Sequence, residues 1–162
     1  MKSNILVTGG AGYIGSTLVG LLLNNQFNVI VLDNLSFTGE SLLNFYSYPN
    51  FKFIKADLTC PDTIRKIFLN DKIDSVIHLA AIVGDPACKS NPKLAHKVNW
   101  KASVDLLDIS IKNGVKRFIF SSTCSNYGKM SNSVAYVDET SHLAPVSLYA
   151  ELKVKFENLL LN

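Results

Sequence analysis

A glycine-rich turn between an apolar run and a helical pattern constrains this sequence more than any other feature. The run Asn4–Val7 leads into Thr8–Gly15, which reads Thr-Gly-Gly-Ala-Gly-Tyr-Ile-Gly, and the residues after it have helical spacing. Gly9 permits a tight turn after the strand, and Gly12 permits a close approach of the backbone to a pyrophosphate. Gly15 allows the helix to pack closely against the sheet. The N-terminus of that helix presents N–H groups and a positive dipole end to the anion. The pattern predicts a strand, turn and helix that bind a dinucleotide.

A carboxylate at the end of the second apolar run makes this prediction more specific. Asp33 follows Phe27–Leu32, where a carboxylate can accept hydrogen bonds from an adenosine ribose and repel the additional phosphate of NADP. Glycine-rich turns alone are common. Together with Asp33, the turn predicts NAD as the cofactor.

Strand-like and helix-like segments alternate along the chain, which is typical of a parallel sheet with helices on both faces. The apolar runs are mostly continuous, as expected for strands covered on both sides. We therefore expect an α/β fold with a doubly wound parallel sheet (Rossmann fold) and treat residues 1–162 as one NAD-binding domain. The expected strands are Asn4–Thr8, Phe27–Leu32, Phe51–Lys55, Ser75–Leu79 and Arg117–Ser121. The expected helices run from Ile14 to about Asn24, Ser41–Tyr46, Pro61 to about Leu69, Pro92 to Gly114 as the residue after the C-cap, and from about Leu148 to Asn162.

Composition excludes several other classes of protein. The 162 residues are 48% hydrophobic and 18% charged with a net charge of +3, and they hold no block of Lys and Arg typical of a nucleic-acid groove. Three cysteines without metal-ligand spacing indicate reduced thiols in the cytosol and no metal site. The apolar segment Ser75–Gly84 is too short to span a membrane.

Tyr149 and Lys153 are spaced i, i+4 on the last expected helix and leave it on the same face. A phenol has a pKa near 10, and a neighbouring ammonium together with a nicotinamide cation favours the phenolate. A phenolate can take a proton from a substrate hydroxyl while hydride leaves the same carbon. The alternative is a half-buried ring beside a solvated lysine. Thr123, at the carboxyl end of the fifth expected strand, favours the functional interpretation because ligands bind at that edge of such sheets; a plain Ser/Thr turn is its alternative.

These motifs resemble, in order and spacing, the extended short-chain dehydrogenases/reductases, and among them the NAD-dependent epimerase/dehydratase family that acts on nucleotide sugars. The motifs that carry the resemblance are Gly9-x-x-Gly12-x-x-Gly15, Asp33-Asn34, Asp57-Leu58, His78-Leu79-Ala80-Ala81, Asn99, Ser121-Ser122-Thr123 and Tyr149-x-x-x-Lys153.

The resemblance implies a role for each matching position. Thr123 polarises the substrate, Tyr149 is the acid/base, and Lys153 holds the nicotinamide ribose. The implied cofactor-binding residues are Gly9, Gly12, Tyr13, Ile14 and Gly15 at the pyrophosphate, Asp33 and Asn34 at the ribose, Asp57 and Leu58 at the adenine, Leu79, Ala80 and Ala81 at the nicotinamide, and Asn99 beneath the active site. The alternatives are a turn for Asp57, a water-facing position for Asn99 and plain core for the two alanines.

Two departures from the family pattern narrow the reaction. Cys124 and Ser125 stand where nucleotide-sugar dehydratases carry Asp-Glu, so the resemblance favours epimerisation over dehydration or decarboxylation.

The remaining cysteines and histidines have structural expectations. Cys88 and Cys124 are expected to be small buried thiols, His78 is expected to be a hydrogen-bonded core residue, and His96 and His142 are expected to be surface residues.

The expected activity is that of an NAD-dependent nucleotide-sugar epimerase. A doubly wound fold normally continues with a further strand after such a last helix, so we expect a truncated chain that lacks the C-terminal strands and the substrate domain. The resemblance also implies a homodimer contact through the Tyr149–Lys153 helix. Two alternatives stay open: an oxidoreductase that releases NADH, and a non-catalytic cofactor-binding fragment.

Overall fold

A computed structural model describes residues 2–128 and 136–162, and these form two compact units. The first, here called the sheet unit, comprises Met1–Ala81 and Ala102–Ser121. The second, the helical unit, comprises Ile82–Lys101 and Ser122–Asn162. Each unit holds a different part of the predicted site.

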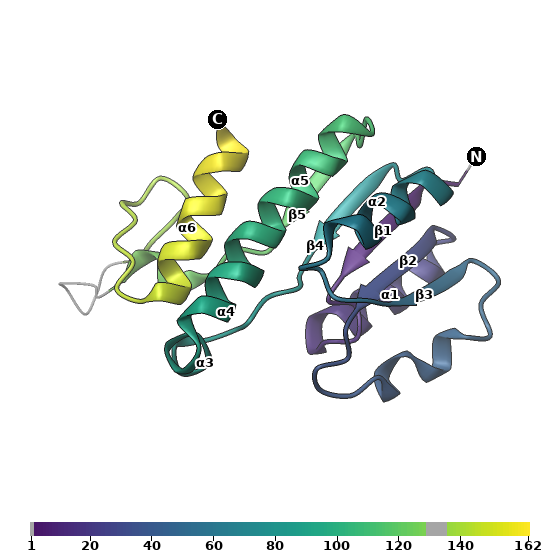
Figure 1. Cartoon of the computed structure of the whole chain (residues 1–162), viewed down its shortest axis with the longest axis horizontal. Coiled ribbons are helices and arrows are strands. Elements are labelled where there is room, and N and C mark those ends of the chain that lie inside the picture. Colours follow the sequence, from purple (N-terminus) through teal and green to yellow (C-terminus); the bar gives the residue numbers. More distant parts are fainter. Residues whose placement is uncertain (1, 129–135) are drawn as a thin grey trace. The chain divides into compact units, whose positions relative to one another are not determined.

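The sheet unit is built on five parallel strands in the order β3-β2-β1-β4-β5. This confirms the predicted parallel α/β fold (Figure 1). Two strands have the expected bounds, and the ends of the other three differ from the expected ones by no more than one residue. The strands are β1 (Asn4–Thr8), β2 (Asn28–Asp33), β3 (Phe51–Lys55), β4 (Ser75–His78) and β5 (Arg117–Phe120).

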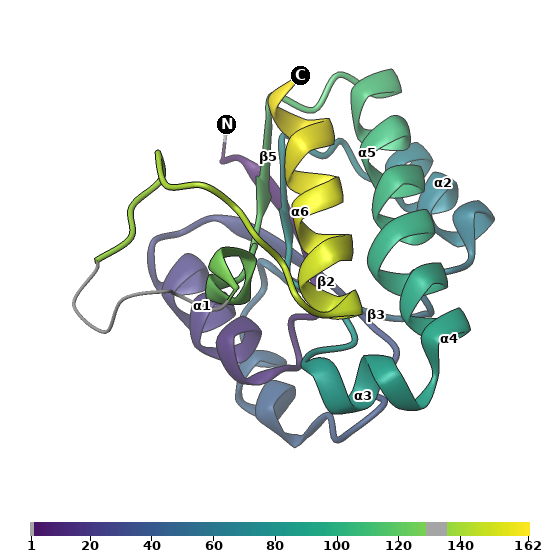
Figure 2. The same cartoon turned by 90° about the vertical axis from the view of Figure 1, so that its left-hand side faces the viewer.

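Both faces of the sheet are buried because successive side chains of a strand point to opposite faces. In β1, Ile5 and Val7 pack in one apolar cluster and Leu6 packs in another. The first cluster contains residues of α1 (Tyr13–Asn24), and the second contains residues of α2 (Pro61–Asn70) and α5 (Ser103–Lys112). Figure 2 shows α1 on one side of the sheet and α2 and α5 on the other. This arrangement explains why the apolar runs of the sequence are continuous.

The helix boundaries in the sheet unit follow local signals. Pro61 is the first residue of α2, a position whose backbone N–H has no partner within the helix, so the N–H that proline lacks is not needed there. Gly114 follows the C-cap of α5 with a φ of +71°, as predicted for a left-handed C′ residue. The expected short helix after β2 is the 3₁₀-helix η1 (Glu40–Phe45).

The helical unit differs most from the sequence prediction. The single helix expected from Pro92 is divided into α4 (Pro92–His96), the π-helix η2 (Lys97–Ala102) and α5. Two further elements were not predicted: α3 (Asp85–Ser90) and the 3₁₀-helix η3 (Cys124–Tyr127). The last helix, α6 (Leu148–Leu161), begins after Ser147, whose hydroxyl accepts from the N–H of Ala150. In the described ranges, the helices are all too short or too polar to cross a membrane.

Candidate functional site

The glycine turn of the sheet unit has no room for a side chain at Gly9, Gly10 or Gly15. Gly9 has a φ of +73°, and a Cβ there would lie 2.7 Å from the backbone nitrogen of Ala80. A Cβ at Gly15 would overlap the carbonyl oxygen of Gly9. Gly12 is the N-cap of α1, and among the described side chains none caps this helix end. The turn therefore leaves the first N–H groups of α1 available for an anion, as a pyrophosphate site requires.

Asp33 connects the end of β2 to this turn. One carboxylate oxygen accepts from the N–H of Ala11 at 3.0 Å, and the other accepts from the N–H of Leu35 at 2.9 Å. A carboxylate has about four acceptor positions, so Asp33 retains capacity for ribose hydroxyls. Tyr13, the first residue of α1, is 94% exposed next to the turn.

The predicted adenine residues divide between the surface and the core. Asn34 Nδ2 donates to Asp57 Oδ2 at 3.4 Å, so these side chains from the ends of β2 and β3 lie together. Asp57 Oδ1 also accepts from the N–H of Thr59 at 2.7 Å, which is the turn considered as its alternative role. The Leu58 side chain is buried in the core of the sheet unit. Any contact of Leu58 with a ligand therefore has to come from its backbone.

A buried polar chain fixes the end of β4. Thr8 Oγ1 lies 2.7 Å from His78 Nδ1, and His78 Nε2 lies 2.9 Å from Ser103 Oγ. His78 is 1% exposed, which confirms a hydrogen-bonded core residue. The Thr8 hydroxyl also accepts from the N–H of Ala80 at 3.3 Å. Leu79, Ala80 and Ala81 are half-buried at the end of this strand, and Ala80 is the residue that Gly9 approaches.

The three predicted catalytic residues lie together in the helical unit. Tyr149 is 8% exposed and Lys153 is 3% exposed on α6. The Lys153 ammonium is 5.9 Å from the centroid of the Tyr149 ring. The side chain of Thr123, which precedes η3, lies close enough to the Tyr149 hydroxyl to affect its ionisation. Thr123 also caps η3 by accepting from the N–H of Ser125 at 3.2 Å, so its predicted turn and its contact with Tyr149 coexist.

Burial opposes the ionisation that was expected here. Desolvation raises the pKa of Tyr149, while the hydrogen bond from Thr123 lowers it, and Cys88, Cys124 and Asp85 raise it further. Desolvation lowers the pKa of Lys153 to about 8. The expected lowering of the phenol pKa is therefore not produced by the side chains around Tyr149.

Asn99, on the π-helix η2, is 2% exposed, so a water-facing position is wrong. Its amide clamps the backbone of Ile82: Oδ1 accepts from the N–H at 2.8 Å, and Nδ2 donates to the carbonyl at 2.9 Å. Nδ2 also lies 3.7 Å from the sulfur of Cys88. Cys88 is buried as expected, whereas Cys124 is exposed, because it begins the unpredicted η3. The clamp fixes the chain just before α3.

Two side-chain links in the helical unit were missed by the sequence analysis. Ser147 Oγ donates to Asp85 Oδ1 at 2.5 Å, which joins the N-termini of α3 and α6. Glu157 accepts hydrogen bonds from Ser122 and Asn126. The available signal for Glu157 was its position four residues after Lys153, on the same helical face.

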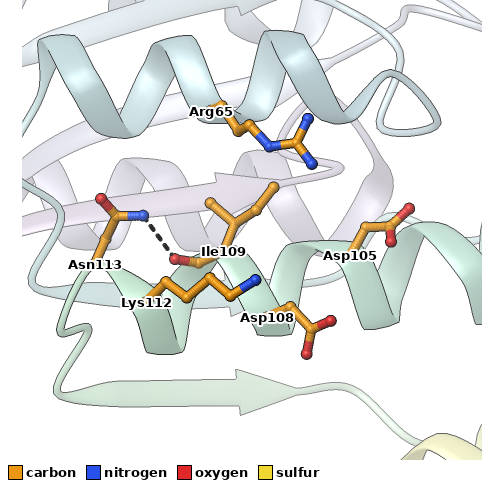
Figure 3. Close-up of a pocket in the computed structure, with 6 residues that line it drawn as sticks. All are labelled: Arg65, Asp105, Asp108, Ile109, Lys112 and Asn113. Carbon is orange, nitrogen blue, oxygen red and sulfur yellow. Dashed lines mark hydrogen bonds between the residues drawn. The ribbon is translucent and has the colours of Figure 1, made fainter.

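A pocket in the sheet unit lies apart from the predicted residues. It is located between α2 and α5, and Figure 3 shows Arg65 on the former facing the side chains of the latter. Its charges balance, and Arg65 is already paired with Asp62 at 2.6 Å. None of the predicted site residues lines it; its lining consists of Arg65, Asp105, Asp108, Ile109, Lys112 and Asn113.

Comparisons with known proteins find relatives over nearly the whole chain. The model of a family described as "NAD dependent epimerase/dehydratase family" matches residues 5–162. A UDP-glucose 4-epimerase of Bacillus subtilis is 33% identical over 159 residues, which are 96% of this chain and 46% of that protein.

Two solved structures have the same fold over nearly the whole chain. A UDP-glucose 4-epimerase of Thermotoga maritima with UDP-glucose has a TM-score of 0.88 and 39% identity, covering 97% of this chain and 50% of that one. A Thermus thermophilus UDP-glucose 4-epimerase in complex with NAD has a TM-score of 0.87 and 31% identity, covering 97% and 49%. The chain thus spans at most half the length of these relatives.

Proposed function

We propose that this chain, which belongs to the NAD-dependent epimerase/dehydratase family, provides the cofactor-binding and acid–base residues of a nucleotide-sugar 4-epimerase. The family is NAD-dependent, in agreement with the cofactor predicted from Asp33. The observation that carries the proposal is the grouping of Thr123, Tyr149 and Lys153 in one compact unit. The 4-epimerases among the relatives support the reaction type.

The sheet unit fits an NAD molecule because its tight glycine turn leads into the N-terminus of α1, which no described side chain caps. Gly9, Gly12 and Gly15, with the backbone of Tyr13 and Ile14, would hold the pyrophosphate. The remaining proposed cofactor residues fall into five groups. Asp33 and Asn34 would bind the adenosine ribose, and Asp57 and the Leu58 backbone the adenine. Leu79, Ala80 and Ala81 would line the nicotinamide, Tyr149 and Lys153 would bind the nicotinamide ribose, and Asn99 would lie beneath the active site.

Each acid–base residue has one task in this proposal. Bound NAD supplies a reversible hydride acceptor, so a sugar carbon is oxidised transiently and reduced again on its opposite face. Tyr149 takes the proton of the sugar hydroxyl and returns it. Thr123 donates a hydrogen bond to the same oxygen, and Lys153 would hold the nicotinamide ribose. Because burial raises the Tyr149 pKa, we expect proton transfer to depend on positive charge brought by the cofactor.

Cys124 and Ser125 support epimerisation over elimination of water. They follow Thr123 and are both exposed at the start of η3. Neither a thiol nor a hydroxyl is a strong acid or base at neutral pH, so the additional proton transfers of a dehydration lack a catalyst at these positions. A homodimer contact through α6 and a cytosolic location stay predictions.

The test is to incubate the full-length protein that contains residues 1–162 with UDP-glucose and to follow two products. Formation of UDP-galactose without accumulation of reduced nicotinamide is the expected result. Stoichiometric accumulation of NADH would instead indicate the alternative oxidoreductase. If neither product forms with any UDP-sugar, while mass spectrometry identifies NAD in the purified protein, a non-catalytic cofactor-binding role replaces the proposal.

A further inference from the structure

Glu157 lies on α6 in line with the proposed catalytic residues. It follows Tyr149 by eight positions and Lys153 by four, and a spacing of four keeps side chains on one helical face. One carboxylate oxygen, Oε2, accepts two hydrogen bonds, from Ser122 Oγ at 2.6 Å and from Asn126 Nδ2 at 2.9 Å. The function proposed above gives Glu157 no task.

Asn126 completes a closed triangle with these two residues. Its Nδ2 also donates to Ser122 Oγ at 2.8 Å. The side chain is 3% exposed, and its Oδ1 is buried with no hydrogen-bond partner among the described residues. Burying an unsatisfied amide oxygen costs about 1–3 kcal/mol. This unfavourable free energy accompanies an orientation in which the amide nitrogen of Asn126 donates to both Glu157 and Ser122.

Two residues of the triangle, Ser122 and Asn126, stand on either side of Thr123 in the sequence. Ser122 directly precedes Thr123, and Asn126 lies in η3, which Thr123 caps by accepting from the N–H of Ser125. Segment 122–126 is therefore attached to α6 at Glu157, through Ser122 and Asn126, and the same segment carries Thr123 beside Tyr149. Because α6 is one rigid helix, this attachment limits how far the threonine hydroxyl can move from the phenol.

We infer that Glu157 is a positioning residue, which holds segment 122–126 on α6 so that the Thr123 hydroxyl stays next to the hydroxyl of Tyr149. This inference rests on the proposed function, because it assigns Glu157 a task in that reaction. The task requires an acceptor with two lone pairs in one direction, and it does not require a charge. A glutamine can therefore replace Glu157, whereas an alanine cannot.

The experiment compares Glu157→Ala, Glu157→Gln and the control Glu151→Ala in the full-length protein. Glu151 is an exposed carboxylate on the same helix, so its loss reports the effect of charge alone. We expect Glu157→Ala to lower kcat roughly 10- to 100-fold, since small displacements of a reacting group have effects of this size. Glu157→Gln should stay within about 3-fold of the natural protein, because its amide oxygen accepts both bonds. KM for the sugar nucleotide should change by less than about 2-fold in all three.

A double-mutant cycle separates positioning from general support of the fold. If Glu157 acts through Thr123, then Glu157→Ala lowers kcat by less than about 2-fold in a Thr123→Ala background. Equal losses in both backgrounds would overturn the inference, and so would an activity of Glu157→Gln as low as that of Glu157→Ala.

A second measurement does not depend on the reaction. Amide hydrogen exchange of residues 122–128 should become at least about 10-fold faster in Glu157→Ala while the rest of α6 is unchanged. Unchanged exchange there would refute the attachment itself. An inactive natural protein with this local change would instead refute the proposed function and leave the attachment established.

Discussion

The two units hold their functional residues by different physical means. In the sheet unit, the proposed cofactor site is formed by backbone: a left-handed glycine, a close approach to Ala80 and an uncapped helix end. In the helical unit, Tyr149 and Lys153 are buried, which shifts the pKa of both, and Glu157 holds segment 122–126 on α6 by side-chain hydrogen bonds. The first site therefore depends on shape, and the second depends on electrostatics and hydrogen bonding. The predictions below test this distinction.

The largest expected effect is loss of chemistry in the helical unit without loss of cofactor binding in the sheet unit. Tyr149→Phe should lower turnover about 10³-fold, within the usual range for an acid–base group. The NAD dissociation constant, measured by calorimetry, should rise by at most about 10-fold, because only one hydroxyl contact with the nicotinamide ribose is lost. Tyr48→Phe, which removes a hydroxyl bonded to Asn24 in the sheet unit, is the control and should retain activity. Full turnover by Tyr149→Phe would remove Tyr149 from its proposed role.

Shape should dominate at the glycine turn. Gly9 and Gly114 have φ values of +73° and +71°, but a Cβ at Gly114 would have no described atom within 4 Å. Gly114→Ala should therefore cost only the backbone strain, about 1 kcal/mol in the free energy of unfolding. Gly9→Ala should cost about 3 kcal/mol, because overpacking against Ala80 is added to that strain. Urea denaturation of both variants gives the comparison, and equal losses would contradict a requirement of close approach.

Electrostatics should dominate at Lys153. Its pKa is lowered from 10.5 to about 8 by burial, so the unfolded chain binds more protons than the folded protein between these values. Stability should therefore rise as the pH increases through that window. Lys153→Met should increase the free energy of unfolding at pH 7 by at most about 3 kcal/mol, and the difference should shrink toward zero above the unfolded pKa. A difference that is independent of pH would show that the lysine is not buried as an ammonium.

The smallest effect is expected from loosening the Asn99 clamp. Asn99→Ala leaves the N–H and the carbonyl of Ile82 without their amide partner. We expect the free energy of unfolding to fall by about 2 kcal/mol, and proteolysis near α3 to become faster. The isosteric Asn99→Leu variant should be no better, because it also lacks both polar atoms. Unchanged stability in both would show that the clamp contributes little.

The sheet unit was largely predictable because its signals are local. The glycine turn, Asp33, Pro61 and Gly114 each act within a few residues of their own position. Strand ends moved by single residues, since the ladder hydrogen bonds, and not the apolar runs, decide where pairing stops.

The helical unit was less predictable because its determinants are not local. Tyr149, Lys153 and Thr123 were identified from their residue types, but the pKa direction of the phenol follows from burial, which no spacing reveals. The π-helix η2 interrupts the regular helical pattern that begins at Pro92, and the short α3 precedes that pattern. Glu157 was recognisable only by its spacing from Lys153, and its partners lie more than thirty residues earlier.

The two backbone hydrogen bonds of Asp33 have a consequence for protein engineering. An attempt to widen coenzyme choice by removing this carboxylate would also release the N–H of Ala11 in the glycine turn and the N–H of Leu35 after β2. The proposed nucleotide selectivity and the observed hydrogen bonds of the loop thus depend on a single side chain. A successful redesign would need a compensating acceptor for Ala11 in the same step, which makes the preference difficult to alter one substitution at a time.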